Sequence, residues 1–138
     1  MVKLIMGNSG SGKTVRLVEL VREAVEDSRN NVVVIEPKKA LTYDIPSQAR
    51  LVPAEEYAVY SSDMMLGFIN GLSAGNYDIT HVFIDNLFKI IGKCPAEQFA
   101  PFLDRLQIFS ERVGISFVIT VSAAPEEYGE AITKYIGD

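Results

Sequence analysis

The residues with the clearest chemistry lie in the segment GNSGSGKT, residues 7–14. Its fixed positions are Gly7, Gly12, Lys13 and Thr14, with four residues between the two glycines. Glycines allow positive φ angles and a close approach of the backbone, so that successive amide hydrogens can point at phosphate oxygens. In this pattern the lysine reaches the β- and γ-phosphates, and the threonine hydroxyl binds Mg²⁺. The segment therefore predicts a site for a nucleoside triphosphate with magnesium.

The four residues between the fixed positions, Asn8, Ser9, Gly10 and Ser11, are predicted to line the same phosphate site. The alternative is a glycine-rich turn that binds no ligand. Glycine makes up only about 7% of an average protein, so a chance match of the whole pattern is rare. The phosphate site also requires a strand before the segment and a helix after it.

The sequence on both sides of the segment predicts these two elements. Residues 2–6 form a short apolar run, which is typical of a buried strand. After Lys13 the apolar residues fall at helical spacing as far as about residue 28, with charged residues on the other faces. A bound anion would therefore meet the N-terminus of a helix, which carries a partial positive charge.

The rest of the chain alternates between predicted strands and predicted helices. We expect strands at residues 32–35, 81–85 and 115–122, a short edge strand at 57–60, and helices at about 62–75, 95–114 and 125–137. Pro101 is expected to split or delay the first turn of the second of these helices. The alternation predicts an α/β fold with three layers, in which helices cover both faces of a mostly parallel sheet. At 138 residues the chain is expected to form a single domain, residues 1–138.

Asp85 is the second residue to which we assign a role in binding. It closes the predicted strand HVFID, residues 81–85, where its carboxylate would hold magnesium directly or through water. The alternative is an aspartate that caps the turn after a strand. Beside the segment at residues 7–14, the metal-binding role is favoured.

The whole chain resembles the phosphate-loop (P-loop) NTPases, and its layout is closest to that of the RecA-like ATPases. The resemblance rests on GNSGSGKT as the first motif and on Asp85 as the acidic second motif. It implies that residues 115–122 form a strand between the two motif strands. It also implies that the chain binds ATP and Mg²⁺, with Lys13 and Asp85 in catalysis and Thr14 and Asp85 as metal ligands.

The position of the catalytic base departs from part of this pattern. AAA+ ATPases usually place glutamate directly after the second-motif aspartate, but this chain has Asn86 there. In RecA-like ATPases the base instead ends the strand after the first helix, and Glu36 lies near that place. A shift of about two residues would put Lys38 there. The alternative is that Glu36 is an acid at a strand end without a catalytic role, since strand ends often meet solvent.

Two further features would contribute to an ATPase site. Ser122, or second to it Thr120, ends the last predicted strand where a γ-phosphate sensor would lie; the alternative is a strand-end hydroxyl or a helix cap. The sequence ends at Asp138, before the further strands of RecA-like hexamers, which argues against self-assembly into an active ring. Arg105 and Arg112 could serve a neighbouring subunit, although arginines on a solvated helix face are commoner.

Composition argues against several other classes of protein. The net charge of -5 argues against a large nucleic-acid surface, although it does not exclude such a partner. One cysteine and one histidine cannot build a conventional zinc site or an internal disulfide. The first residues form too short an apolar run for a signal peptide, and no membrane span is expected. We therefore expect a cytoplasmic protein.

Three functions are compatible with these residues. The first is ATP hydrolysis, and the second is a nucleotide-dependent binding module or switch whose segment 37–60 changes order with the γ-phosphate. The third is a nucleoside or other small-molecule kinase, against which stands the lack of an arginine-rich lid. No guanine-reading Asn-Lys-x-Asp stretch is present, which favours ATP over GTP. A protein partner or an oligomer is compatible with all three.

Overall fold

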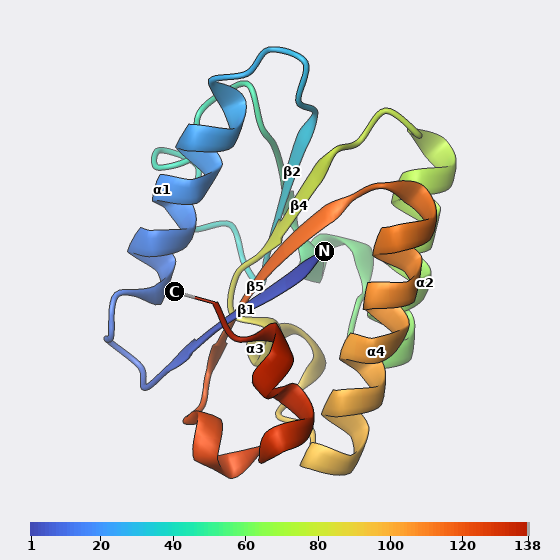
Figure 1. The fold of residues 1–138 in the computed structure, drawn as a ribbon. Coiled ribbons are helices and arrows are strands. Elements are labelled where there is room, and N and C mark those ends of the chain that lie inside the picture. The colour runs from blue at the N-terminus through green and yellow to red at the C-terminus, as the bar shows by residue number, and fades with distance from the viewer. Residues whose placement is uncertain (138) are drawn as a thin grey trace.

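The computed structural model describes residues 1–137, which form one parallel sheet with helices on both faces (Figure 1). The strands are β1 (Val2–Gly7), β2 (Val32–Glu36), β3 (Arg50–Pro53), β4 (His81–Ile84) and β5 (Ser116–Ser122). Their order across the five-stranded sheet is β1-β5-β4-β2-β3, and every pair of neighbours is parallel. The predicted α/β class with a parallel sheet is confirmed, as is the position of the last strand between the strands that end at Gly7 and Ile84.

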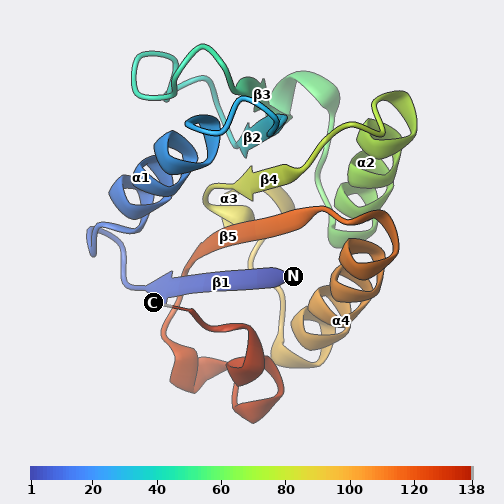
Figure 2. The same ribbon diagram turned by 45° about the horizontal axis from the view of Figure 1, so that its top comes forward.

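The helices divide between the two faces of the sheet. Helix α1 (Lys13–Val25) covers one face, whereas α2 (Ser62–Gly75) and α4 (Ala96–Val113) cover the other (Figure 2). Shorter helical segments complete the chain: α3 (Leu87–Ile91) and the 3₁₀ helices η1 (Ala54–Tyr57), η2 (Pro125–Glu127) and η3 (Glu130–Tyr135). The predicted three-layer arrangement is therefore the one observed.

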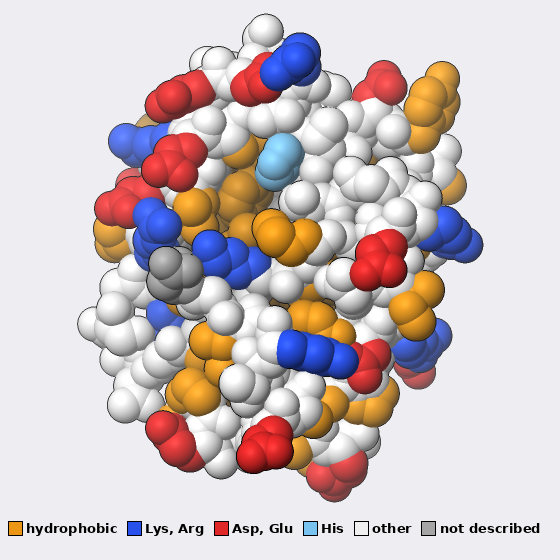
Figure 3. All heavy atoms as spheres, in the orientation of Figure 1, with side chains coloured by type: hydrophobic (Ala, Val, Ile, Leu, Met, Phe, Trp, Pro, Cys, Tyr) orange, Lys and Arg blue, Asp and Glu red, His pale blue; other side chains and the backbone are white. Residues whose placement is uncertain are grey.

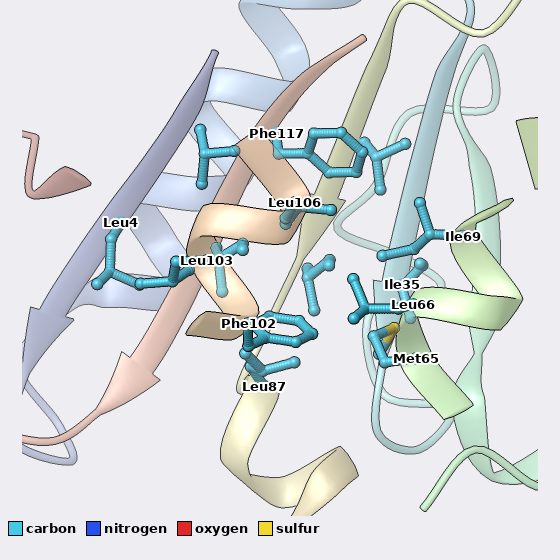
Figure 4. Packing of buried hydrophobic residues seen from close by; sticks show 14 of the residues in the cluster. Leu4, Ile35, Met65, Leu66, Ile69, Leu87, Phe102, Leu103, Leu106 and Phe117 are labelled. Carbon is cyan, nitrogen blue, oxygen red and sulfur yellow. The ribbon is translucent and has the colours of Figure 1, made fainter. Parts of the chain in front are cut away.

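Two hydrophobic clusters hold the layers together. The larger one fills the space between the sheet and the helices α2 and α4, and its largest fully buried side chains include Phe117, Leu103 and Leu106 (Figure 4). The smaller one joins Leu17 and Val21 of α1 to the opposite face of the sheet. All five residues of β2 are buried because both of its faces are covered.

The strand register brings four residues with functional potential to the carboxyl end of the sheet. Gly7 pairs with Ser122 at the ends of β1 and β5. Residues 35, 84 and 119 are aligned across β2, β4 and β5, so that Glu36 and Asp85 leave their strands at neighbouring positions. Because parallel strands have their carboxyl ends at the same end of the sheet, the loops that follow them meet there.

The predicted edge strand at residues 57–60 is wrong. The edge strand is β3, and the chain then enters η1 and turns at Ala58, which has a φ of 58°. The backbone N–H of Glu55 donates to the carbonyl of Pro37, and the chain does not continue as a strand after β3. The β-propensity of residues 57–60 is therefore overridden by tertiary contacts.

Two predictions about proline-containing helices also need correction. Helix α4 begins at Ala96 and continues through Pro101, which is exposed. Because this proline has no N–H, one carbonyl of the helix lacks its helical donor. The carbonyl lies on the solvated face, where water can donate instead. The predicted closing helix at residues 125–137 is instead the pair η2 and η3, separated by Gly129 with a φ of 70°.

Candidate functional site

The glycine loop, residues 7–14, joins β1 to α1, and three of its glycines have a physical reason to be there. Gly10 and Gly12 have φ angles of 83° and 86°, which strain any other residue. A Cβ atom added at Gly7 would lie 2.6 Å from the Ser11 hydroxyl oxygen. The loop is thus tightly folded, and Ser9, Gly10 and Gly12 line a cavity of about 350 Å³.

Lys13 lies across this loop as the first residue of α1. Its ammonium group donates to the carbonyl of Asn8 at 2.8 Å and to the Ser11 hydroxyl at 3.4 Å, and only 8% of the residue is exposed. Burial lowers the pKa of Lys13, and the nearby carboxylate of Asp85 acts in the opposite direction. The side chain therefore places a partly desolvated positive charge against a loop rich in backbone amides.

Thr14 and Asp85 are brought together from positions 71 residues apart. The Thr14 hydroxyl donates to the carboxylate of Asp85, with distances of 3.1 Å to Oδ1 and 3.3 Å to Oδ2. Asp85 itself is only 4% exposed. A hydroxyl beside a carboxylate is an all-oxygen donor pair of the kind that suits Mg²⁺, whose remaining positions are usually filled by water and substrate phosphates. Among residues 1–137 there is no group of three or more His, Cys, Asp or Glu side chains that could hold a metal without such additional ligands.

Thr120 holds Asp85 in place, a role that the sequence pattern did not reveal. Its hydroxyl donates to Asp85 Oδ1 at 2.9 Å and accepts the backbone N–H of Asn86 at 2.9 Å. Thr120 is fully buried in β5, which lies between β1 and β4 in the sheet. The available signal was a hydroxyl inside the buried, otherwise apolar run 117–121 of β5, since a buried hydroxyl needs a partner.

Asn86 redirects the chain after Asp85. Its backbone is left-handed, with φ 53° and ψ 57°, and it caps the start of α3. The side-chain oxygen of Asn86 accepts a hydrogen bond from the Ser122 hydroxyl at 3.3 Å. Ser122 therefore lines the cavity beside the glycine loop, where its contact is with Asn86.

Glu36 also lies at the site, where it binds the loop that follows its own strand. Its Oε1 atom accepts the backbone N–H groups of Ala40 and Leu41 at 3.0 and 3.1 Å. Its Oε2 atom is buried and has no hydrogen-bond partner among the described residues. Burial raises the pKa of Glu36, and the nearby Asp85 adds to that effect, while the two backbone hydrogen bonds oppose it.

Two cavities meet above these residues. The smaller one, described above, includes Lys13, and the larger one, of about 610 Å³, includes Glu36 and Asp85. Thr14, Asn86 and Lys89 line both. The site is therefore continuous from the glycine loop to the end of β2.

Several other residues considered in the sequence lie away from this site. Arg105 pairs with the exposed Asp63, and Arg112 lies over the ring of Phe109. His81 is stacked on Phe83 at the opposite end of β4, and burial lowers its pKa. These contacts are structural.

Cys94 lines neither of the two cavities. It is buried, and its backbone carbonyl accepts a hydrogen bond from the Tyr128 hydroxyl at 2.9 Å. Burial raises the pKa of the Cys94 thiol, which disfavours the reactive thiolate.

Comparison with known proteins assigns no family to the chain. No protein-family model matches it, and no curated protein sequence matches it closely enough to count as a relative. Within residues 1–137, no helix has both the length and the apolar composition needed to cross a membrane.

Proposed function

We propose that this chain binds a nucleoside triphosphate, with ATP favoured over GTP, in a Mg²⁺-dependent manner and hydrolyses it, as its resemblance to RecA-like P-loop ATPases implies. The observation that carries the proposal is the contact between Thr14 and Asp85, directly beside a glycine loop with a buried lysine. Two motifs predicted separately to bind phosphate and metal thus meet at one place. A glycine-rich turn without a ligand would not require this meeting.

Different residues of the chain would bind the phosphates, bind the metal and orient water. Amides of the glycine loop and Lys13 bind the phosphates, and preorganised charges of this kind carry most of the catalysis of phosphoryl transfer. Thr14 and Asp85 would hold Mg²⁺, which neutralises charge on the phosphate oxygens when bound. Glu36 is the candidate for orienting the attacking water.

Calorimetric titration of the protein with ATP and with GTP, each in magnesium, tests this proposal. We expect saturable binding by the wild-type protein and its loss in the variant Lys13→Ala, with the circular dichroism spectrum unchanged. A phosphate-release assay on the same samples then measures hydrolysis. Absence of binding to either nucleotide at millimolar concentration would refute the proposal.

A nucleotide-dependent switch is the second candidate function. It is favoured by one observation, namely that Glu36 binds the amides of Ala40 and Leu41 instead of leaving both carboxylate oxygens free for water. If Glu36 turns from these amides towards a bound ligand, the loop after β2 loses two hydrogen bonds. The order of the loop then depends on whether the site is occupied. Nucleotide binding without phosphate release would favour this function over hydrolysis.

A further inference from the structure

Lys89 lies where the two cavities of the site meet. It belongs to α3, which starts directly after the left-handed Asn86. Because Asn86 turns the chain sharply, the third residue after it returns to the mouth of the site and lines both cavities together with Thr14. No sequence motif pointed to this residue.

The charge of Lys89 is not neutralised within the described part of the chain. Its side chain is exposed and takes part in no salt bridge or side-chain hydrogen bond among residues 1–137, whereas other lysines, such as Lys93 and Lys134, pair with acids. Lys89 is also close enough to Lys13 to contribute to the lowered pKa of that residue, after burial. Two ammonium groups that repel each other across a cavity favour a polyanion between them.

The position of Lys89 relative to Thr14 indicates which part of a bound nucleotide it would meet. The threonine of such a loop binds the metal that bridges the β- and γ-phosphates. Thr14 and Lys89 share both cavities, and the larger cavity continues towards Glu36, the candidate for orienting water. The terminal phosphate would therefore lie at the junction, within reach of Lys89.

We propose that Lys89 binds the terminal phosphate of the triphosphate from within the same chain, so that it distinguishes triphosphate from diphosphate and stabilises the charge that develops during hydrolysis. This inference rests on the proposed function. It gives the chain a source of positive charge in its own site, whereas Arg105 and Arg112 are engaged elsewhere. A cation supplied to the transferring phosphoryl group accelerates such reactions by about 10³-fold or more.

The test compares Lys89→Ala and Lys89→Arg with Lys134→Ala. Lys134 is exposed, lies in η3, where it pairs with the exposed Asp104, and lines neither cavity, so that its removal changes the net charge equally without touching the site. Dissociation constants for ATP and ADP in magnesium are measured by calorimetry, and hydrolysis is measured in single turnovers. Circular dichroism verifies that each variant is folded.

We expect Lys89→Ala to weaken ATP binding about tenfold or more, because a charge-assisted hydrogen bond is lost, and to change ADP binding less than about twofold. Hydrolysis should fall by a larger factor than ATP affinity, while Lys89→Arg should retain most of the discrimination between ATP and ADP. Lys134→Ala should behave as wild type.

Two results would overturn the inference while leaving the proposed function intact. One is equal weakening of ATP and ADP binding in Lys89→Ala, and the other is indistinguishable behaviour of Lys89→Ala and Lys134→Ala. If the wild-type protein binds neither nucleotide, the proposed function itself fails, which the wild-type titration alone reveals.

Discussion

Glu36 has one carboxylate oxygen that binds two backbone amides and one buried oxygen without a partner. A buried polar atom without a partner is unfavourable, and such atoms are often found where a residue has a second arrangement or a ligand to meet. Burial raises the pKa of this residue above its ordinary value of 4.5. Its ionisation therefore opposes folding in the absence of a ligand.

The replacement Glu36→Gln tests this effect through the pH dependence of stability. Below about pH 4.5 the acid is neutral in both the folded and the unfolded states. As the pH rises, Glu36 ionises first in the unfolded state. The stability that its neutral form provides is therefore lost as the pH rises from the unfolded-state pKa through the folded-state pKa. We expect the free energy of unfolding of Glu36→Gln, relative to wild type, to increase between pH 4 and pH 7, as measured by urea denaturation without nucleotide.

Hydrolysis by the same variant tests the chemical role of Glu36. If Glu36 orients water, Glu36→Gln should bind ATP as tightly as wild type but release phosphate more slowly. Unchanged release would remove Glu36 from the mechanism. An unchanged pH profile of stability would show that the carboxylate is solvated.

Thr120 offers a second test at the level of single residues. The isosteric change Thr120→Val leaves Asp85 Oδ1 and the N–H of Asn86 without this partner inside the protein. We expect the free energy of unfolding to fall by about 1–3 kcal/mol. Ser122→Ala is the matched control, because Ser122 is less buried and makes a longer contact; equal effects of the two changes would contradict the assigned role.

At the level of elements, Pro101 is the least favourable residue of α4. It lies inside the helix and is exposed, so that no packing requires it. We expect Pro101→Ala to raise the free energy of unfolding by about 1–2 kcal/mol, since alanine restores a helical hydrogen bond while the unfolded chain becomes more flexible. Urea denaturation measures the change.

The opposite outcome is expected at the other end of the same helix. Gly114 ends α4 with a φ of 75°, so Gly114→Ala should reduce the free energy of unfolding by about 1 kcal/mol. A loss of stability in Pro101→Ala would show that the proline shapes the helix in a way that its neighbours require.

The loop after β2 is the element that a nucleotide would affect most directly. Lys38 and Lys39 are exposed trypsin sites next to Ala40, whose amide binds Glu36. If the loop is a switch, the rate of tryptic cleavage after these lysines should differ between ATP and ADP. Identical cleavage with ATP, with ADP and without nucleotide would count against the switch.

The strands and the glycine loop were predictable because their signals are local. Short β-branched runs fully buried on both faces, such as β2, leave few alternatives, and a fixed spacing of glycines describes one loop. The strand β3 and the helix α3 were not predictable in this way. β3 contains Arg50 and Pro53 and depends on pairing with β2, and α3 follows a left-handed Asn86 that no pattern predicts.

The candidate site was predictable to the same extent. Residues at strand ends were found because parallel strands end at a common edge, which applies to Asp85 and Ser122. The contacts of Thr120 and Lys89 were not found, since they depend on side-chain direction and on the turn after Asp85. Such contacts join residues far apart in the chain and leave no periodic signal.

At the level of the whole molecule, acidic residues outnumber basic ones, with 18 Asp and Glu against 13 Lys and Arg. Acidic and basic side chains are interspersed on the face shown in Figure 3, in keeping with the net charge of -5. A phosphate ligand is therefore expected to be attracted by the local charges of Lys13 and Lys89 and not by the protein as a whole.

Nucleotide binding should stabilise the whole fold, because the glycine loop forms a binding site only when β1 and α1 are folded. At a ligand concentration of about 100 times Kd, the stabilisation is about 2.7 kcal/mol, which corresponds to a rise in Tm of about 5–10 °C for a domain of this size. We expect this rise with Mg-ATP in a thermal denaturation scan and no rise in Lys13→Ala. An equal rise in that variant would place the ligand elsewhere.

The buried position of the single cysteine gives this protein an intrinsic reporter. Cys94 is 8% exposed and its thiol is held in the protonated form by a raised pKa, so a labelling reagent can react only when the structure around it opens. The rate of thiol modification therefore reports how often the structure around Cys94 opens. Measured over a series of denaturant concentrations, it would separate local fluctuation near Tyr128 from unfolding of the entire chain.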